Sequence, residues 1–278
     1  MVNKKMSIFK DWGKPRVLIR GAGDIATGIG HRLFRCGFEV MMTEIASPTC
    51  IRRRVAFSEA VYDGMTQVEG INSVLVRDPE EAVLQAKSGY IPILIDPEAK
   101  CREELKPQVL VDAILAKKNL GTFKEMAPIV IGVGPGFLAG NDCHAVVETM
   151  RGHNLGRVIL DGEAEKNTGV PGDIIGFSRE RVIYADRSGT LKLIKDIGDM
   201  VEEKEAVAEI DGDPVFSPIR GVLRGIIRDG FHVDKGMKIG DVDPRGAAEN
   251  CFTISDKARA VAGGVLEAVL FFMNQILN

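Results

Sequence analysis

The stretch RVLIRGAGDIATGIGHRLFRCGFEVMMTE, residues 16–44, decides the fold of this chain. A β-branched run enters a turn that contains Gly21 and Gly23, and a helical pattern continues from the turn to Gly37. A second apolar run follows at 38–42. This order predicts a strand, a turn of the size that holds a phosphate, a helix and a second strand.

The small residues of the turn match a nucleotide-binding pattern of the form GxGxxA. Gly21 permits the tight turn, Gly23 lets the backbone approach a pyrophosphate, and Ala26 lets helix and strand pack closely. Glu44 follows about 20 residues later, where an acid can accept hydrogen bonds from a ribose. We predict a Rossmann-like nucleotide- or cofactor-binding domain over 14–155, the alternative being a βαβ turn whose glycines serve packing alone. Its first ligand contacts would be Gly21, Gly23, Asp24, Ala26 and Glu44.

Further ligand contacts are expected at the same carboxyl edge of the sheet, where open α/β folds bind ligands. Arg52, Arg53 and Arg54 follow the second strand, and a guanidinium fork suits a phosphate, although such a triplet is also typical of a solvated turn. Asp96 ends an apolar run at 91–95, where it either contacts ligand or caps the next turn. We expect Arg52, Arg53 and Asp96 to line the site.

A second glycine-rich loop, GVGPGFLAGNDCH, occupies residues 132–144 after a buried β-branched run. It feeds no clear helix and is therefore not a Walker loop. The backbone around Gly134, Pro135 and Gly136 either forms an anion nest or makes a tight turn between domains.

Three side chains are weak candidates for catalysis. Cys50 precedes the arginines, and nearby cations favour a thiolate, although most single cysteines are inert. His144 and His153 lie in HAVVETMRGH, where acidic, basic and imidazole groups crowd around a glycine, although a lone histidine is more often structural. With four histidines and five scattered cysteines, the sequence predicts no metal site and no disulfide framework.

Composition sets limits on the class of protein. A length of 278 residues with 45% apolar content allows about two domains. A net charge of −3 gives no electrostatic reason to expect nucleic acid or membrane as partners. The first 14 residues contain no apolar run, so we expect no secretory signal and a cytoplasmic location. The apolar stretch at 260–277 is interrupted by glycines and polar residues and predicts a buried or interface helix.

The pattern changes after Arg157, where short apolar runs separated by glycines predict a mostly β domain over 156–250. The expected strands include 158–160, 173–175, 181–184 and 191–194. A final helix, within 251–278 and capped by Ser255, is expected to pack on the body of the protein or at an interface.

This β region contains an internal repeat. Residues 198–210 align with 230–242 at a constant offset of 32, in the pattern G-x-x-V followed farther on by [VI]-x-acid-[VI]. Two such hairpins covering one core resemble the barrel-sandwich hybrid of biotinyl and lipoyl carrier domains. The expected hairpin tip at 210–216 has no lysine, so we expect neither biotin nor lipoate.

Several long motifs together resemble the YqeB-type family of accessory proteins of selenium-dependent molybdenum hydroxylases. The motifs, spread over about residues 15 to 270, are GAGDIATGIGHRL, IRR with AFSEAVYDG, GVGPGFLAGNDCHAVVETMRGHNLGRVI, GVLRGIIRDG, KIGDVDPR and ISDKARAVAGGVLEA. The resemblance implies a role in maturing, inserting or modifying the molybdenum cofactor, similar in logic to the XdhC group of chaperones. It implies a nucleotide or molybdopterin-type cofactor as ligand, and the hydroxylase and its cofactor-maturation proteins as partners.

Two alternatives stay open. The first is an NAD(P)-dependent oxidoreductase, for which Glu44 would favour NAD over NADP, although none of the three tyrosines has a lysine four residues on. The second is a non-catalytic scaffold that docks the hydroxylase through its β half. A homo-oligomer is compatible with each of these functions.

Overall fold

The computed structural model describes residues 13–169 and 172–276, so most of the segment for which no secretory signal was expected lies outside it. The described chain divides into two compact units. The first contains 13–46, 57–167 and 255–276, and the second contains 47–56 together with the described part of 168–254. These boundaries differ from the expected ones, because a short segment after the second strand belongs to the β unit and the C-terminal helix belongs to the α/β unit.

The first unit is built on a nine-stranded sheet in the order β10-β9-β7-β6-β1-β2-β5-β4-β3. The strands from β9 to β4 run parallel, and an antiparallel strand closes each edge. The bounds are β1 (Arg16–Arg20), β2 (Glu39–Glu44), β3 (Met65–Val68), β4 (Ile71–Val76), β5 (Ile91–Ile95), β6 (Val109–Asp112), β7 (Ile129–Val133), β9 (Ala145–Val147) and β10 (Val158–Ile159). The expected α/β class with a mostly parallel sheet is confirmed.

Helices cover both faces of this sheet, which explains why its strands β6 and β7 are buried along their whole length. On one face, α2 (Asp24–Arg35) packs so closely that a Cβ added at Gly30 would lie 3.4 Å from Met42 Sδ. On the other face, Leu18 and Met41 share a core with Ala82 of α4 (Pro79–Lys87). Neighbouring side chains along each strand therefore face different helices.

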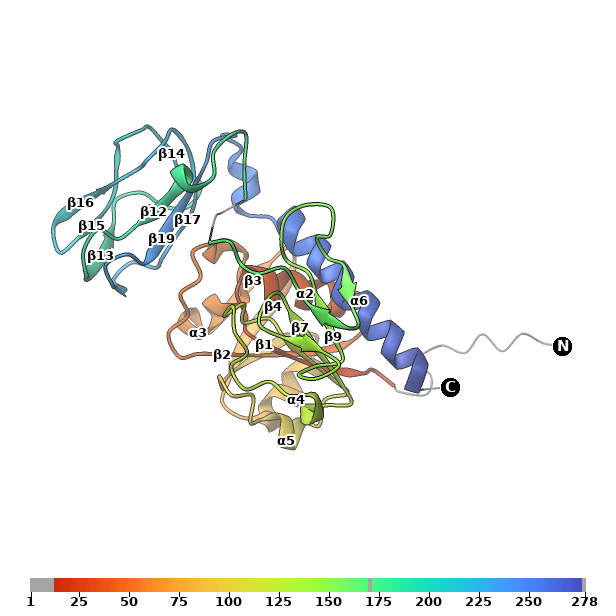
Figure 1. Cartoon of the computed structure of the whole chain (residues 1–278). Helices are drawn as coiled ribbons and strands as arrows, with labels where there is room; N and C mark the ends of the chain where they lie inside the picture. The colour runs from red at the N-terminus through yellow and green to blue at the C-terminus, as the bar shows by residue number, and fades with distance from the viewer. Residues whose placement is uncertain (1–12, 170–171, 277–278) are drawn as a thin grey trace. The chain divides into compact units, whose positions relative to one another are not determined.

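The long C-terminal helix α6 (Asp256–Ile276) packs beside α2 within the first unit (Figure 1). Ser255 caps it as expected, because the Ala258 N–H donates to Ser255 Oγ at 3.1 Å. By length and composition alone α6 could cross a membrane, with a mean hydropathy of 1.2. In the first unit its small residues approach α2 closely, since a Cβ added at Gly28 would lie 2.9 Å from the Ala258 Cβ.

The second unit holds two four-stranded antiparallel sheets, β12-β19-β17-β14 and β16-β15-β13-β18. Their bounds are β12 (Val182–Tyr184), β13 (Gly189–Leu193), β14 (Met200–Val201), β15 (Ala206–Ile210), β16 (Asp213–Phe216), β17 (Gly221–Ile226), β18 (His232–Val233) and β19 (Lys238–Asp243). The run at 173–175 was expected to form a strand; it makes only an isolated bridge between Ile174 and Phe177, because no neighbouring strand extends the pairing.

The repeat of the sequence appears as two matching strand pairs. β14 and β15 in the first copy correspond to β18 and β19 in the second, and each pair divides its strands between the two sheets. Val201 and its counterpart Val233 are buried in one common core. The apolar positions of the repeat are therefore the positions at which the two copies meet.

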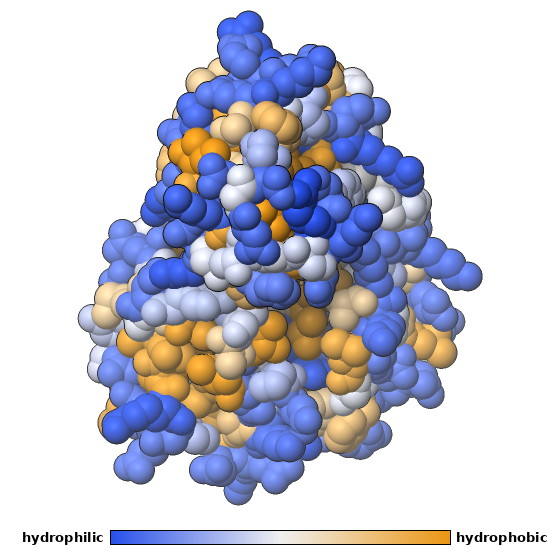
Figure 2. Space-filling view, turned by 90° about the vertical axis from the view of Figure 1, so that its left-hand side faces the viewer, coloured by the Kyte–Doolittle hydropathy of each residue, from blue (hydrophilic) through white to orange (hydrophobic). Residues whose placement is uncertain are grey.

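Shorter elements complete the chain. They are η1 (Arg53–Val55), η2 (Phe57–Glu59), α3 (Ala60–Asp63), α5 (Arg102–Leu105), η3 (Lys124–Met126), β8 (Leu138–Ala139), β11 (Gly162–Glu163), η4 (Arg179–Arg181) and η5 (Ala248–Cys251). On the face drawn in Figure 2, apolar side chains gather in patches between hydrophilic ones.

Candidate functional site

The turn after β1 requires a glycine at one position and leaves space at another. Gly21 has φ +91°, and a Cβ added there would lie 3.0 Å from the Ala113 carbonyl oxygen. Gly23 has φ −66°, and a Cβ added there would meet nothing within 4 Å. Gly21 is therefore required by the fold, whereas the space beside Gly23 is open to a ligand.

Gly23 is the N-cap residue of α2 and supplies no side chain to the end of the helix. The Asp24 carboxylate accepts from the Ile25 N–H at 2.9 Å, and the Thr27 hydroxyl donates to the Ala22 carbonyl at 3.1 Å. Among the described residues no acceptor faces the N–H of Gly23. The end of α2 thus combines a backbone donor, the positive end of the helix dipole and open space.

Glu44 holds the turn from the neighbouring strand. Its carboxylate accepts from the N–H of Ala22 and from the N–H of Ile45, each at 2.8 Å. Burial raises the pKa of Glu44, and these two hydrogen bonds oppose that effect. The acid thus lies beside the glycine turn as expected, and each of its oxygens already accepts a backbone donor.

Lys257, which the sequence did not single out, lies in the first turn of α6 close to this end of α2. Burial lowers the pKa of Lys257, while the nearby carboxylates of Asp24 and Glu148 raise it and Arg151 lowers it further. Among the described residues Lys257 makes no ion pair within 4.0 Å. A half-buried ammonium group at a glycine turn is a suitable partner for an anionic ligand.

We expect Lys257 to react with an amine-specific reagent at lower pH than an ordinary lysine, because burial lowers its pKa. The measurement is competitive labelling with acetic anhydride across a pH series, with mass spectrometry of each peptide. The exposed Lys87 in α4 serves as the internal reference. A Lys257 profile with its midpoint near pH 10.4 would contradict this assignment.

A buried charge network lies at the same edge of the sheet. Arg20 ends β1 and pairs with Asp112 at the end of β6, with 3.0 Å between Nη1 and Oδ2. Arg20 also donates to the Pro97 carbonyl at 2.8 Å, and Thr122 donates to Asp112 at 2.5 Å. Arg20, Asp112 and Thr122 are each 2% exposed. The network therefore fixes the loops around the turn and does not face a ligand.

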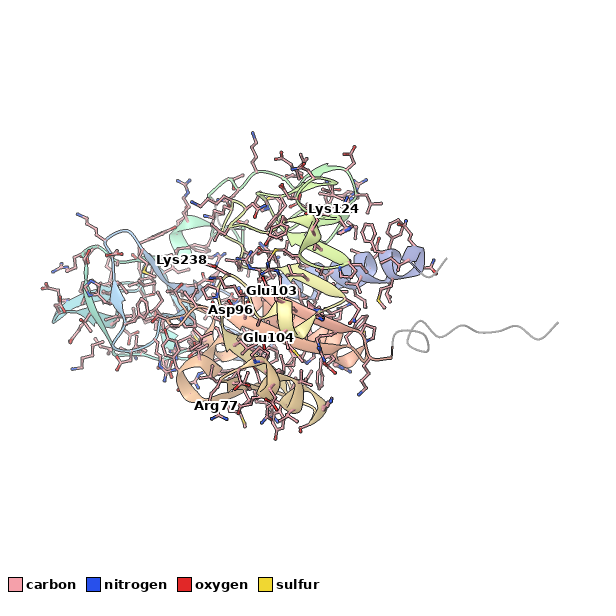
Figure 3. All side chains as sticks on the ribbon, turned by 90° about the horizontal axis from the view of Figure 1, so that it is seen from below. Arg77, Asp96, Glu103, Glu104, Lys124 and Lys238 are labelled. Atoms are coloured by element: carbon pink, nitrogen blue, oxygen red, sulfur yellow. The ribbon has the colours of Figure 1, made fainter. Side chains whose placement is uncertain are left out.

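Asp96 lies at the carboxyl end of β5, as expected, and is labelled in Figure 3. Its carboxylate accepts from the Cys101 N–H at 2.7 Å. Burial tends to raise the pKa of Asp96, but hydrogen bonds from Cys101 and its neighbours outweigh this effect and lower it. Asp96 thus caps the turn that follows the strand.

Protein atoms fill the space around the second glycine loop. A Cβ at Gly134 would lie 2.8 Å from Thr149 Oγ1, and a Cβ at Gly136 would lie 2.6 Å from Lys118 Cα. Pro135 between them is half-buried. This geometry matches the tight-turn alternative rather than an open anion nest.

A hollow of about 400 Å³ follows this loop. Four of its nine lining residues are acidic, and Arg157 is its one basic residue. The Glu148 carboxylate, 2% exposed, accepts from the N–H groups of Thr149, Met150 and Glu165 at 2.6–2.8 Å. The acidic lining does not suit a phosphate.

The two candidate histidines have different surroundings. His144 accepts from the Val130 N–H at 2.9 Å through Nδ1 and packs edge-on against Phe272, with 5.6 Å between ring centres. Burial lowers the pKa of His144. His153 is exposed. Among the described residues no three His, Cys, Asp or Glu side chains form a group that could hold a metal ion.

Arg52, Arg53 and Arg54 belong to the second unit, together with Cys50. Arg52 donates to the Asn250 carbonyl at 2.9 Å. Arg53 donates to the Ile226 carbonyl at 2.8 Å and, with Arg54, pairs with Asp196. These contacts attach the short segment 47–56 to β17 and η5, so the triplet is not grouped in one unit with Gly21 and Glu44.

The fold and the turn define the class of protein: an α/β protein with a mixed, mostly parallel sheet, an open glycine turn at a helix N-terminus and a separate antiparallel β unit. No known protein-family profile matches the chain.

The chain is homologous to a protein of Escherichia coli K12 described as uncharacterized protein YqeB. The two are 49% identical over 263 residues, which are 95% of this chain and 49% of YqeB. The chain thus spans about half the length of this curated relative.

Two crystal structures align weakly with the chain. A succinylglutamate desuccinylase from Silicibacter sp. TM1040 is 13% identical with a TM-score of 0.24, over 82% of this chain and 84% of that one. An aspartoacylase family protein from Mesorhizobium loti is 11% identical with a TM-score of 0.27, at the same coverage. Alignments of this quality support no conclusion about fold or activity.

Proposed function

We propose that the first unit binds a phosphorylated or nucleotide-bearing small molecule, such as molybdopterin, at the Gly23 end of α2, and that the chain acts as an accessory protein in the maturation of a selenium-dependent molybdenum hydroxylase. The observation that carries the binding proposal is the uncapped helix N-terminus with open space at Gly23, beside the half-buried Lys257. The accessory role rests on the sequence resemblance and on the homology with YqeB.

The topology supports the Rossmann-like interpretation. The chain passes from β1 to β2 on one side and later to β6 on the other, so the turn after β1 lies at the point where the strand order reverses. In open α/β sheets this crevice is the usual ligand site. For the second unit we propose a barrel-sandwich hybrid that presents the ligand or docks the hydroxylase, because its two repeat copies exchange strands between two sheets.

Gly23→Val is expected to weaken binding of the ligand at least about tenfold, because the added side chain fills the open space at the helix end. The measurement is titration calorimetry of the purified chain with CTP, GTP, ATP, NADH and molybdopterin dinucleotide. Gly23 has φ −66°, which valine can adopt, so the variant is expected to fold.

Lys257→Met tests the same site from α6 and is expected to weaken the same ligand, whereas Lys87→Met, at an exposed lysine, leaves binding unchanged. Absence of binding by all five compounds would overturn the proposal. Binding of NADH alone, with turnover on an added electron acceptor, would support the oxidoreductase alternative instead.

A further inference from the structure

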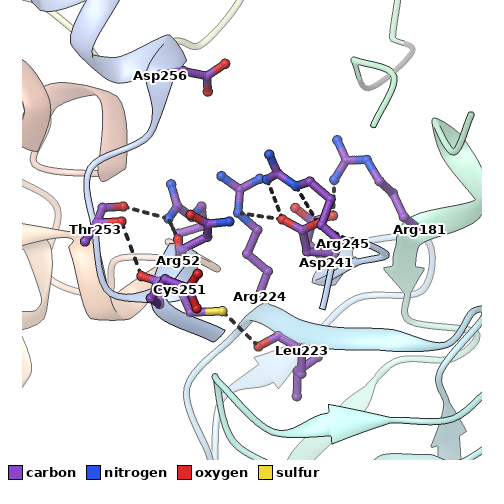
Figure 4. Close-up of polar contacts among 12 residues, drawn as sticks. Arg52, Arg181, Leu223, Arg224, Asp241, Arg245, Cys251, Thr253 and Asp256 are labelled. Carbon is purple, nitrogen blue, oxygen red and sulfur yellow. Dashed lines mark hydrogen bonds and ion pairs between the residues drawn. The ribbon is translucent and has the colours of Figure 1, made fainter. Parts of the chain in front are cut away.

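The second unit contains a buried cluster of charges that the proposed function does not use. Three arginines pair with two aspartates at one end of the sheet that contains β17 and β19, and a fourth arginine lies beside one of the three (Figure 4). Asp241 and Asp243 are 5% and 0% exposed. The arginines are Arg52, Arg181, Arg224 and Arg245. Four guanidinium groups against two carboxylates leave a formal excess of two positive charges.

The two aspartates are already occupied by two of the arginines. Arg245 donates to both oxygens of Asp243, through Nε at 2.9 Å and Nη2 at 2.6 Å. Arg181 donates to Asp241 and to the Gly172 carbonyl, the latter at 3.2 Å. Among the described residues these two arginines thus make the guanidinium hydrogen bonds to the two carboxylates, and Arg224 makes none of them.

Arg224 lacks such a partner among the residues that the structure describes. Its side chain is 9% exposed, and its ion pair with Asp243 is long, with 3.8 Å between Nε and Oδ2. No hydrogen bond satisfies its buried Nε. Burial lowers the pKa of Arg224, and the charge of Arg52 lowers it further. A buried guanidinium N–H without a hydrogen-bond acceptor is costly unless an anion completes it.

The local fold holds Arg224 in this position. It lies in β17 at an irregularity, where the pairing with β19 shifts between Leu223 and Gly225. A Cβ added at Gly225 would lie 2.7 Å from the Ile51 carbonyl oxygen, so segment 47–56 packs directly on β17 and brings Arg52 beside Arg224. The bulge thus places the guanidinium group of Arg224 beside that of Arg52. Two neighbouring positive charges do not stabilise the fold by themselves.

We propose that Arg224, together with Arg52, binds the phosphate group of an anionic ligand within the second unit. A guanidinium fork matches two oxygens of a tetrahedral oxoanion, and a phosphate dianion neutralises the two excess charges. The bound phosphate group belongs either to inorganic phosphate or to a phosphorylated metabolite. This site is separate from the glycine turn of the first unit.

The test uses the full chain carrying Gly23→Val, so that binding at the turn does not contribute. Inorganic phosphate is titrated by calorimetry at constant ionic strength, and Tm is followed in parallel. We expect phosphate to bind and to raise Tm, and Arg224→Met to weaken binding about 10- to 100-fold. Arg224→Lys, which keeps the charge but loses the fork, should weaken it about tenfold. Arg220→Met, at an arginine whose side chain is 73% exposed, should bind as before.

Two further titrations, with CMP and with acetate, identify the kind of ligand. CMP binding at least about tenfold tighter than phosphate would assign the site to the phosphoryl group of a larger molecule, and equal affinities would assign it to free phosphate. Acetate that binds as tightly as phosphate would show that the site does not select a tetrahedral oxoanion, and would contradict the proposal. The proposal also fails if phosphate produces no response, or if Arg224→Lys and Arg224→Met both retain full affinity.

Discussion

Asp112→Ala is expected to lower the free energy of unfolding of the first unit by about 3–5 kcal/mol, because it leaves the buried guanidinium of Arg20 without its carboxylate. Arg20 and Asp112 are each 2% exposed and join the ends of adjacent parallel strands. Asp112 also accepts from the Ile114 N–H at 3.2 Å, so the loop after β6 loses a contact as well. The measurement is urea unfolding followed by circular dichroism.

A double variant shows how much of the lost unfolding free energy comes from the uncompensated charge of Arg20 and how much from the loss of packing. Replacing a buried ion pair by apolar residues of similar volume is often close to neutral, so Arg20→Met combined with Asp112→Leu should recover most of the lost stability. Glu98→Ala provides the surface control, because Glu98 and Lys100 form an ion pair with side chains 68% and 73% exposed. An Asp112→Ala protein that unfolds at the wild-type urea concentration would show that the pair does not stabilise this edge.

The sequence predicts the first unit well because its signals are local. Apolar runs and a helix stop at Gly37 each depend on a few neighbouring residues, and the structure ends α2 at Arg35, just before this stop. The repeat at an offset of 32 is also local to each copy, and its strands begin at Met200 and His232.

The candidate site is harder to predict because its residues meet through long-range packing. Lys257 reaches the end of α2 only because α6 returns to the first unit after the whole β unit. Arg52 and Arg53 leave the first unit because carbonyl groups 198 and 173 residues later, respectively, accept their hydrogen bonds. An acid such as Glu44 lies where the pattern expects it, but the pattern does not show that backbone donors already occupy its oxygens.

The second large effect is expected at α6, where two neighbouring glycines should respond in opposite directions to the same substitution. A Cβ added at Gly264 would lie 2.1 Å from the Gly156 carbonyl oxygen and 2.8 Å from Val147 Cγ1. Gly264→Ala must therefore push the helix off the sheet edge and should cost about 1–3 kcal/mol of unfolding free energy. A larger residue such as valine should cost more.

Gly263→Ala is the matched control, because its Cβ would lie at an ordinary 3.5 Å from Arg32 Nη1. Alanine stabilises a helix interior relative to glycine by up to about 1 kcal/mol, so this variant should be neutral or slightly more stable. Gly264→Ala gains the same stabilisation from helix propensity. The difference in unfolding free energy between the two variants, measured by urea unfolding, therefore reports the close approach of α6 to Gly156. Equal midpoints would mean that α6 does not pack on this edge as closely as the structure shows, and Lys257 would then lose its fixed position beside the glycine turn.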